Sequence, residues 1–410
     1  MHTDILIIGG GASGLAAAIA AKQADRSLSV TVCEKNDRVG KKLLATGNGR
    51  CNFTNRSDDP EHFHGSIDAA GLINETVPAE EFFSDMGMLS AADPQERVYP
   101  YSNSAPTVLN TLRAAVSSLG AEEICSFNVT DYRKKGNCWE VISEGGKTIT
   151  AKCIIIATGG YAAPVYGTDG SVIRLLREKG YKIAKLSPAV APLRVAPESV
   201  KGLKGVRARC TVTAVANGEK LRTEEGELQF TENSLSGICV FNLAYLYAEH
   251  QDDLWISADF APDMDIENIR DYLNRISEIR PTADITALTA GMFSKNLAAF
   301  LVKTALKRPL TDSIMDIDKR ETGKLAHTIK DCHFYITGAS SWQNAQSTLG
   351  GVHADEVSKD LSSRRERGVY FCGEVLDTAG DCGGFNLKWA WASGIIAGKS
   401  AAVSLKGAER

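Results

Sequence analysis

Three glycines near the start of the chain have the spacing of a phosphate-binding loop. Gly9, Gly11 and Gly14 follow an apolar stretch, residues 4–8, and precede an alanine-rich stretch. In a strand–turn–helix unit, the first glycine permits a tight turn, the second lets the backbone approach a pyrophosphate, and the third lets the helix lie close to the sheet. The N–H groups that open the helix then face the phosphates. The pattern predicts a dinucleotide site at the end of the first strand.

An acidic residue stands where such a unit needs one. Glu34 closes a second apolar run, residues 30–34, and lies about 20 residues beyond Gly14, the offset typical of a βαβ nucleotide-binding unit. A carboxylate at this place accepts hydrogen bonds from an adenosine ribose and disfavours a 2′-phosphate. The same fingerprint serves FAD and NAD, so it does not choose between them.

The loop over residues 37–55 is a second candidate, since it is rich in Gly, Lys, Arg and Asn. Lys42 and Arg50 supply positive charge for a pyrophosphate or a flavin; a rigid polar turn with a solvated basic face is the alternative interpretation. Cys51 follows Arg50 directly, which predicts either a lowered thiol pKa and a role as acid or nucleophile, or an inert packed cysteine. We predict Cys51 and Arg50 as the catalytic residues.

Later segments supply the strands and the helix that must complete this fold. A buried strand over residues 153–156 leads into a second glycine turn, and another over residues 368–372 ends in Gly-Glu. Between residue 34 and the strand at residues 153–156, we expect a helix over residues 107–119 and a hairpin around Gly136. A Gly-Gly loop then opens a final helix, expected over residues 388–405, and places backbone N–H groups and a positive dipole near a ligand.

The middle of the chain has a different pattern. From about residue 187, short alternating runs and an Asn-Gly hairpin signal predict a small antiparallel sheet or barrel. Residues 264–330 read as helical, and a strand over 332–337 returns to the barrel. The predicted class is α/β, a Rossmann-like FAD domain of the two-dinucleotide-binding type with two insertions. The expected domains are residues 1–188 with 346–410, residues 189–262 with 331–345, and residues 263–330.

Composition narrows the function classes. The chain has 410 residues and a net charge of −4, which gives no overall attraction to nucleic acid or to an anionic membrane. No apolar run approaches the ~20 residues that span a bilayer, and the first apolar stretch is a strand without a basic leader, so we expect a cytoplasmic protein. The ten cysteines form no C-x-x-C pair and no cluster has zinc spacing, so we expect neither disulfides nor a metal.

Taken together, these segments resemble the BaiN/YhiN-type (HI0933-like) FAD-dependent flavoproteins, and the resemblance runs nearly end to end. It is carried by residues 9–14, by the block Gly40-Lys41-Lys42-Leu43-Leu44-Ala45-Thr46-Gly47-Asn48-Gly49-Arg50-Cys51-Asn52-Phe53-Thr54-Asn55, and by residues 157–160, 347–352 and 373–387. It implies an FAD domain interrupted by a small β-barrel and a helical domain. One departure is that Glu232 and Ser234 stand where the family usually carries His and Gly.

The resemblance and the motifs together assign a set of FAD contacts. These are Gly9, Gly11, Ala12, Ser13, Gly14, Glu34, Lys35, Lys42, Leu43, Thr46, Gly47, Asn48, Arg50, Cys51, Asn52, Val129, Ala157, Thr158, Gly159, Gly373, Glu374, Asp377, Gly384, Phe385, Asn386 and Leu387. No dedicated nicotinamide domain is visible, so NAD(P)H is expected as a transient electron donor that leaves before the substrate binds.

The resemblance leaves three functions open. The first is reduction of a conjugated C=C bond in a steroid-like small molecule by hydride from flavin N5. The second is reduction of uridine to dihydrouridine in ribosomal RNA, for which a basic track would serve. The third is an oxygen-using oxidase of a small amine such as aminoacetone. The basic track that would bind ribosomal RNA in the second function comprises Lys41, Lys42, Arg50, Arg56, Lys201, Lys204, Arg207 and Arg209.

Overall fold

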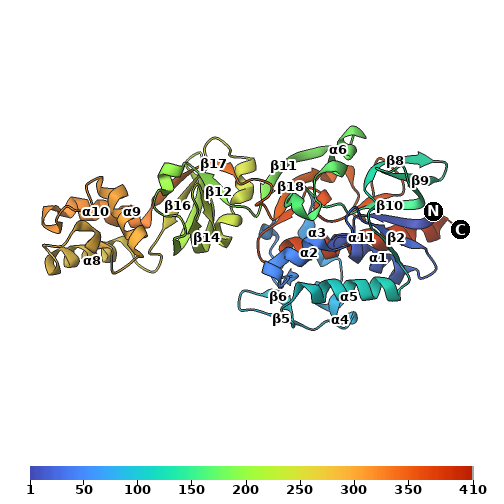
Figure 1. Cartoon of the computed structure of the whole chain (residues 1–410), viewed down its shortest axis with the longest axis horizontal. Coiled ribbons are helices and arrows are strands. Elements are labelled where there is room, and N and C mark those ends of the chain that lie inside the picture. The colour runs from blue at the N-terminus through green and yellow to red at the C-terminus, as the bar shows by residue number, and fades with distance from the viewer. Residues whose placement is uncertain (409–410) are drawn as a thin grey trace. The chain divides into compact units, whose positions relative to one another are not determined.

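The computed structural model describes residues 1–408, which form two compact units. The first unit comprises residues 1–188 and the described chain from residue 342 onward, and the second comprises residues 189–341 (Figure 1). The predicted separation of the second unit into a barrel domain and a helical domain stays a prediction. Among residues 1–408, no helix combines the length and the apolar character that crossing a membrane requires.

A seven-stranded sheet, ordered β7-β2-β1-β10-β9-β8 with β19 also paired to β10, forms the centre of the first unit. Strands β7, β2, β1 and β10 are parallel, and β19 is parallel to β10. Their bounds are β1 (His2–Ile8), β2 (Val30–Cys33), β7 (Glu122–Ile124), β8 (Val129–Lys135), β9 (Cys138–Ser143), β10 (Thr148–Ile156) and β19 (Val369–Phe371). This sheet confirms the predicted Rossmann-like class.

Strand β10 is longer than the sequence pattern suggested. The first half, Thr148–Ala151, pairs antiparallel with β9, and the second half, Ile154–Ile156, pairs parallel with β19. The buried strand predicted over residues 153–156 is the second half of β10. The two halves form one continuous strand. Its first half alternates between exposed and buried residues, and its second half is buried on both faces.

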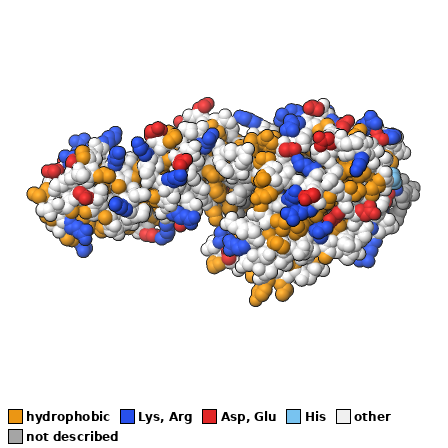
Figure 2. Space-filling model, in the orientation of Figure 1, with side chains coloured by type: hydrophobic (Ala, Val, Ile, Leu, Met, Phe, Trp, Pro, Cys, Tyr) orange, Lys and Arg blue, Asp and Glu red, His pale blue; other side chains and the backbone are white. Residues whose placement is uncertain are grey.

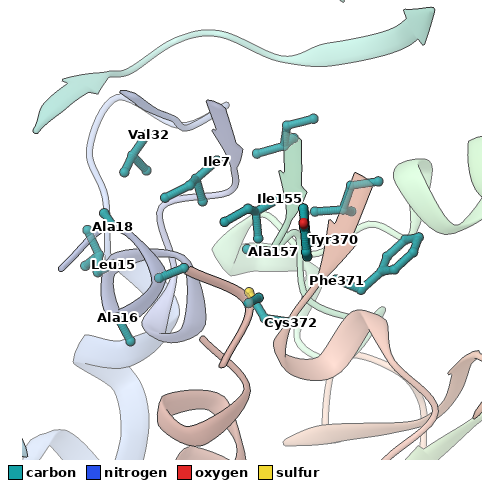
Figure 3. Close-up of a cluster of buried hydrophobic side chains, with 14 of the residues drawn as sticks. Ile7, Leu15, Ala16, Ala18, Val32, Ile155, Ala157, Tyr370, Phe371 and Cys372 are labelled. Atoms are coloured by element: carbon teal, nitrogen blue, oxygen red, sulfur yellow. The ribbon is translucent and has the colours of Figure 1, made fainter. Parts of the chain in front are cut away.

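Helices cover the sheet, and two of them pack backbone to backbone. The helices are α1 (Ala12–Ala24), α5 (Ala105–Ser118), α6 (Ser171–Glu178) and α11 (Phe385–Ala408). A methyl group at Gly394 or Gly398 of α11 would lie 2.4 Å from the carbonyl oxygen of Ser13 or 2.2 Å from that of Ala17 in α1. Glycine at these positions allows the close approach. Figure 3 shows side chains from α1, β1, β2, β10 and β19 that belong to the core.

Helix α11 begins three residues earlier than the predicted residue 388. Gly383 and Gly384 both have positive φ, so the turn is completed before Phe385 and the helix starts there. The smaller elements of this unit are α2 (Lys41–Ala45), α3 (Ala69–Asn74), α4 (Ala79–Asp85), β3 (Thr54–Asn55), β4 (Phe63–His64), β5 (Ser90–Ala92), β6 (Arg97–Pro100), β18 (Ser347–Val352) and β20 (Ala379–Gly380). Strand β11 (Ile183–Ala189) pairs with β18, β20 with β4, and β6 lies between β3 and β5.

The second unit contains the predicted barrel, closed in the order β12-β15-β14-β13-β16-β17. Its strands are β12 (Leu193–Val195), β13 (Arg207–Ala216), β14 (Glu219–Phe230), β15 (Ser234–Ser236), β16 (Trp255–Asp259) and β17 (Cys332–Ala339). All the pairings are antiparallel, with the Asn217-Gly218 turn joining β13 to β14. The helices are α7 (Ile238–Phe241), α8 (Ile266–Ile279), α9 (Lys295–Leu306) and α10 (Lys319–Lys330).

Candidate functional site

The first glycine loop has two structural glycines and one that faces open space. Gly9 has φ +113°, and a methyl group there would lie 2.4 Å from the carbonyl oxygen of Ala157, while one at Gly14 would lie 2.0 Å from the carbonyl oxygen of Gly9. A methyl group at Gly11 would meet nothing within 4 Å. Gly9 and Gly14 therefore hold β1, α1 and the end of β10 together, and Gly11 leaves room for a ligand.

The N-terminus of α1 opens onto this space. Its N-cap is Gly11, and no side chain caps the helix. The N–H groups of the first turn have no partner within the helix, and the helix dipole places partial positive charge at this end. An uncapped helix start behind a glycine loop suits a phosphate group, whose oxygens accept several backbone hydrogen bonds at once.

Glu34 is held against the glycine loop by backbone donors. Its Oε2 accepts a hydrogen bond from the Gly10 N–H at 2.9 Å, and its Oε1 accepts from the backbone and side-chain N–H groups of Asn36 at 2.8 and 2.7 Å. The Phe127 N–H donates to the Glu34 carbonyl oxygen at 2.9 Å, which brings the segment before Val129 alongside. These contacts fix the carboxylate where the ribose of an adenine nucleotide is expected, and Oε2 has capacity for another donor.

The polar loop over residues 37–55 exposes part of its backbone and side chains to solvent. Gly47 and Asn48 both have left-handed φ/ψ angles, and residues 47–50 are exposed. Asn52 points the other way. Its Oδ1 is buried without a hydrogen-bond partner and lies 2.9 Å from where a methyl group at Gly384 would stand. An unpaired buried acceptor is costly, and a ligand N–H near Gly384 would satisfy it.

Residues 373–384, here named the second glycine loop, bring the C-terminal part of the chain to the start of α1. A methyl group at Gly373 would lie 2.4 Å from Ser13 Oγ, and one at Gly384 would lie 2.4 Å from the carbonyl oxygen of Thr54. Asn386 holds this loop closed, because its Oδ1 accepts from the Gly380 N–H at 2.9 Å and its Nδ2 donates to the Gly380 carbonyl at 2.6 Å. Its side chain therefore organises the loop.

Two predicted cofactor lysines lie in ion pairs. Lys42 Nζ is 2.8 Å from Glu374 Oε2, and Lys35 Nζ is 2.8 Å from Asp169 Oδ2. Burial raises the pKa of Asp169, but hydrogen bonds from Lys35 and Ser171 outweigh that effect and lower the pKa to about 2. Both lysines thus have a fixed position at the edge of the site.

Many of the predicted cofactor-binding residues lie next to one another in the structure, but a few are buried elsewhere in the first unit. Neighbouring pairs among the predicted residues are Gly9 with Ala157, Gly10 with Glu34, Ser13 with Gly373, and Asn52 with Gly384. Leu43 and Val129 are buried in the hydrophobic core. Asp377 is buried, and its Oδ2 accepts from the Ser66 N–H at 3.1 Å.

Of the two interpretations of Cys51, the structure agrees with the packed cysteine and not with a lowered thiol pKa. Burial raises the pKa of Cys51 to about 12, with a smaller opposing contribution from a hydrogen bond to Thr46. Its neighbour Arg50 turns away and stacks over Tyr99, with the guanidinium carbon 5.0 Å from the ring centroid. A fully buried thiol with this pKa is protonated at neutral pH, so it cannot be the thiolate nucleophile. Whether Cys51 and Arg50 are catalytic stays a prediction.

Sequence reasoning missed three residues beside the second glycine loop. Asp381 is buried and bonds to two imidazoles, with Oδ2 2.9 Å from His62 Nδ1 and Oδ1 2.8 Å from His64 Nε2. The only local signal was a His-x-His pair, which places both rings on one face of an extended segment. The carboxylate lies 319 positions away in the chain from His62, so no spacing in the sequence connects them.

The residues of the first unit fit FAD. The uncapped start of α1 and the open side of Gly11 suit a pyrophosphate, and Glu34 suits a ribose. In the described chain, Asn52 Oδ1 and Thr158 Oγ1 are buried atoms without partners, and both belong to segments predicted to contact the cofactor. Such atoms are expected at a binding site that a polar ring system completes.

Comparison with known proteins supports this assignment. The family model of the HI0933-like protein Rossmann domain matches residues 3–400. The 3-dehydro-bile acid delta(4,6)-reductase of Clostridium scindens is 33% identical over 404 residues, covering 97% of this chain and 98% of that protein. The ribosomal RNA dihydrouridine synthase of Escherichia coli is 27% identical over 424 residues, covering 97% of this chain and 99% of that protein.

Solved structures share the fold. The fumarate reductase subunit FrdA of E. coli matches with a TM-score of 0.53 at 15% identity, covering 100% of this chain and 71% of that one. A 3-ketosteroid-delta4-(5alpha)-dehydrogenase from Rhodococcus jostii RHA1 matches with a TM-score of 0.50 at 15% identity, covering 98% of this chain and 97% of that one.

Proposed function

Because the chain belongs to the HI0933-like Rossmann-domain family and is an FAD-dependent oxidoreductase, we propose that it reduces a C=C bond conjugated with a carbonyl group in a small, steroid-like molecule. Bound FAD supplies the hydride chemistry, which the protein side chains cannot perform. NAD(P)H is the proposed source of electrons. The Clostridium scindens relative, a bile acid reductase by name, supports the substrate class.

The observation that carries the proposal is the meeting of both glycine loops at the start of α1. Gly11 leaves the phosphate space open, and Glu34 is oriented by Gly10 toward the expected ribose. Asn52 offers its unpaired oxygen beside Gly384, where an N–H edge of the flavin ring would find an acceptor. Backbone N–H groups and the dipole of α11 behind Gly384 place positive potential there, which stabilises a reduced, anionic ring.

The charges of the proposed basic track favour a small substrate over RNA. In the second unit, Arg209 Nη1 is 2.7 Å from Asp263, Arg207 Nη1 is 3.3 Å from Glu227, and Lys204 is paired with Glu232. Figure 2 shows acidic and basic side chains interspersed on the visible face. Affinity for RNA comes largely from cations that release counterions from phosphates, and cations already paired with carboxylates contribute less.

The basic residues of the first unit are engaged in the same way. Arg56 Nη2 is 3.0 Å from Glu80, Lys41 Nζ is 2.7 Å from Asp37, and Lys42 is paired with Glu374. Uridine reduction remains the second candidate, because the E. coli dihydrouridine synthase matches the chain over its whole length. It uses the same chemistry, since the C5=C6 bond of uracil is also conjugated with a carbonyl. The amine oxidase prediction has no supporting observation here.

Rapid mixing under anaerobic conditions tests the proposal. The FAD-loaded protein is first reduced with NADH or NADPH and then mixed with a Δ4-3-keto bile acid, with cyclohex-2-enone, or with protein-free ribosomal RNA. We expect the steroid enone to reoxidise the flavin faster than buffer alone, with the saturated ketone as product. Reoxidation by RNA but not by the enones would favour the second candidate. Failure of both nicotinamides to reduce the flavin would refute the proposed electron source.

A further inference from the structure

The proposed reduction needs a proton as well as a hydride, and neither glycine loop supplies an acid. Hydride addition to the β-carbon of an enone leaves negative charge on the α-carbon and the carbonyl oxygen, which a proton must neutralise. Cys51 is buried and its pKa is raised to about 12, and burial raises the pKa of Cys382 to about 11 although Arg97 opposes it. Thiols of this kind hold their proton more tightly than an imidazolium does, so a histidine near the same loop is the stronger candidate for the donor.

The side chains of His62, His64 and Asp381 form a cluster at the base of the second glycine loop, here named the His–Asp–His cluster. Strand β4, which ends in His64, pairs with β20, and β20 leads directly into Asp381. The Asp381 N–H donates to the His62 carbonyl oxygen at 2.9 Å. The cluster is therefore fixed to the loop that precedes α11.

Aromatic packing ties the cluster to the start of α11. The His62 ring stacks on Phe385, with the centroids 4.1 Å apart and the planes at 24°. Phe385 is the first residue of the helix and follows Gly384, the glycine that Asn52 faces. His62 thus stands one ring away from the loop that is expected to bind the flavin.

The carboxylate gives the two imidazoles opposite tautomers. Asp381 is 1% exposed and accepts from both rings, through His62 Nδ1 and His64 Nε2. The proton of neutral His62 is therefore on Nδ1, which leaves Nε2 as the nitrogen that can gain and release a second proton. His62 keeps 29% of its side chain exposed, compared with 12% for His64, so its ring is the more accessible of the two.

We propose that His62, oriented by Asp381, donates the proton that completes the reduction; this rests on the proposed function. Two electrons and a hydrogen reach the β-carbon as hydride from the reduced flavin, and the proton on His62 Nε2 passes to the α-carbon. The C=C π bond is lost, two C–H bonds form, and neutral His62 regains its proton from solvent. Asp381 holds the ring through His62 Nδ1, and His64 is a positioning residue on the other carboxylate oxygen.

The test separates this role from a structural one. His62→Asn keeps an N–H where Nδ1 donates to Asp381 but removes the acid, and exposed His327 on α10 gives the matched control His327→Gln. Stopped-flow reduction of the bound flavin by NADPH and its reoxidation by a Δ4-3-keto bile acid are measured for each variant. We expect unchanged reduction and roughly 10²–10⁴-fold slower reoxidation for His62→Asn only. Equal slowing of both steps, or an unchanged reoxidation rate, would overturn the proposal.

A second measurement does not depend on turnover. In ¹⁵N-histidine spectra of the protein, His62 should show the Nδ1–H tautomer and His64 the Nε2–H tautomer at high pH, and Asp381→Asn should abolish this difference. The same titration must account for Arg97 and Cys382, the other charged or titratable groups against the loop. Identical tautomers in the unmodified protein would refute the cluster. Wild-type flavin that no enone reoxidises would instead refute the proposed function while leaving the tautomer result standing.

Discussion

Gly11 and Gly14 lie three positions apart, and the structure gives them opposite environments. A methyl group at Gly14 would stand 2.0 Å from the backbone oxygen of Gly9, whereas one at Gly11 would meet nothing within 4 Å. Gly11 also has φ −85° and ψ −167°, extended angles that alanine adopts without strain. We therefore predict that Gly14→Ala damages the fold, while Gly11→Ala damages only the binding of FAD.

The magnitudes follow from the contacts. Overpacking costs about 1–3 kcal/mol, and the clash at Gly14 is with backbone that cannot rotate away. Replacing a helical glycine by alanine returns up to about 1 kcal/mol, so Gly14→Ala should destabilise the apoprotein by up to ~2 kcal/mol. Gly11→Ala should leave the apoprotein nearly unchanged, because the entropic gain of about 0.4–1 kcal/mol is offset by the poorer N-cap preference of alanine. If the added methyl occupies ligand space at a similar overpacking cost, FAD affinity should fall roughly 5- to 150-fold.

Two assays on the same preparations decide the matter. Urea unfolding of the apoproteins, followed by circular dichroism, gives stability, and titration of FAD fluorescence gives affinity. The expected pattern is a stable Gly11→Ala apoprotein with weakened FAD binding, and a Gly14→Ala apoprotein with a lower unfolding midpoint. Wild-type FAD affinity in Gly11→Ala would show that the open space is not the phosphate site, and wild-type stability in Gly14→Ala would refute the packing argument.

Three further predictions follow from individual contacts. Cys51→Ser should retain FAD binding and flavin reduction. The Cys51 thiol should resist alkylation in the folded protein near neutral pH, because its pKa is raised to about 12. Rapid alkylation, measured by peptide mass spectrometry, would contradict this prediction. Gly398→Ala, whose methyl would lie 2.2 Å from the α1 backbone, should lower thermal stability, whereas Gly323→Ala in α10, with nothing within 4 Å, should raise it by about 1 kcal/mol. The pKa of Asp169 is lowered to about 2, so its pairing with Lys35 contributes stability above pH 3.8 that is lost as the pH falls toward 2. After allowance for solvent screening, this contribution is below about 1 kcal/mol. Asp169→Asn should flatten that part of an acid-unfolding curve.

Local patterns predicted the elements well where one feature decides the structure. Glycine at positions 9 and 14 is dictated by contacts within one strand–helix unit, so spacing alone was enough. The barrel followed from alternation and from the Asn217-Gly218 turn, which are also local. The continuity of β10 was missed because its second half is buried by β19, a strand more than 200 positions later in the chain.

Side-chain environments that depend on distant segments could not be predicted in the same way. The sequence left open whether Arg50 lies beside the Cys51 thiol or the thiol is packed in the core; in the structure Arg50 stacks on Tyr99 and the thiol is fully buried. Adjacency in sequence placed the two residues next to each other without saying where their side chains point. The His–Asp–His cluster likewise joins segments from opposite ends of the chain, so its members had no shared signal.

Glu232 and Ser234, where the sequence departs from the family it resembles, bear on the choice of substrate only if their loop contacts the substrate. Ser234 is buried in β15, and its hydroxyl donates to Asn233 Oδ1 at 3.2 Å. Glu232 is 74% exposed and pairs with Lys204, a residue of the proposed basic track. The family's usual His at this position carries no fixed negative charge and would leave that lysine available to a phosphate. The acidic residue therefore acts against polyanion binding at this surface.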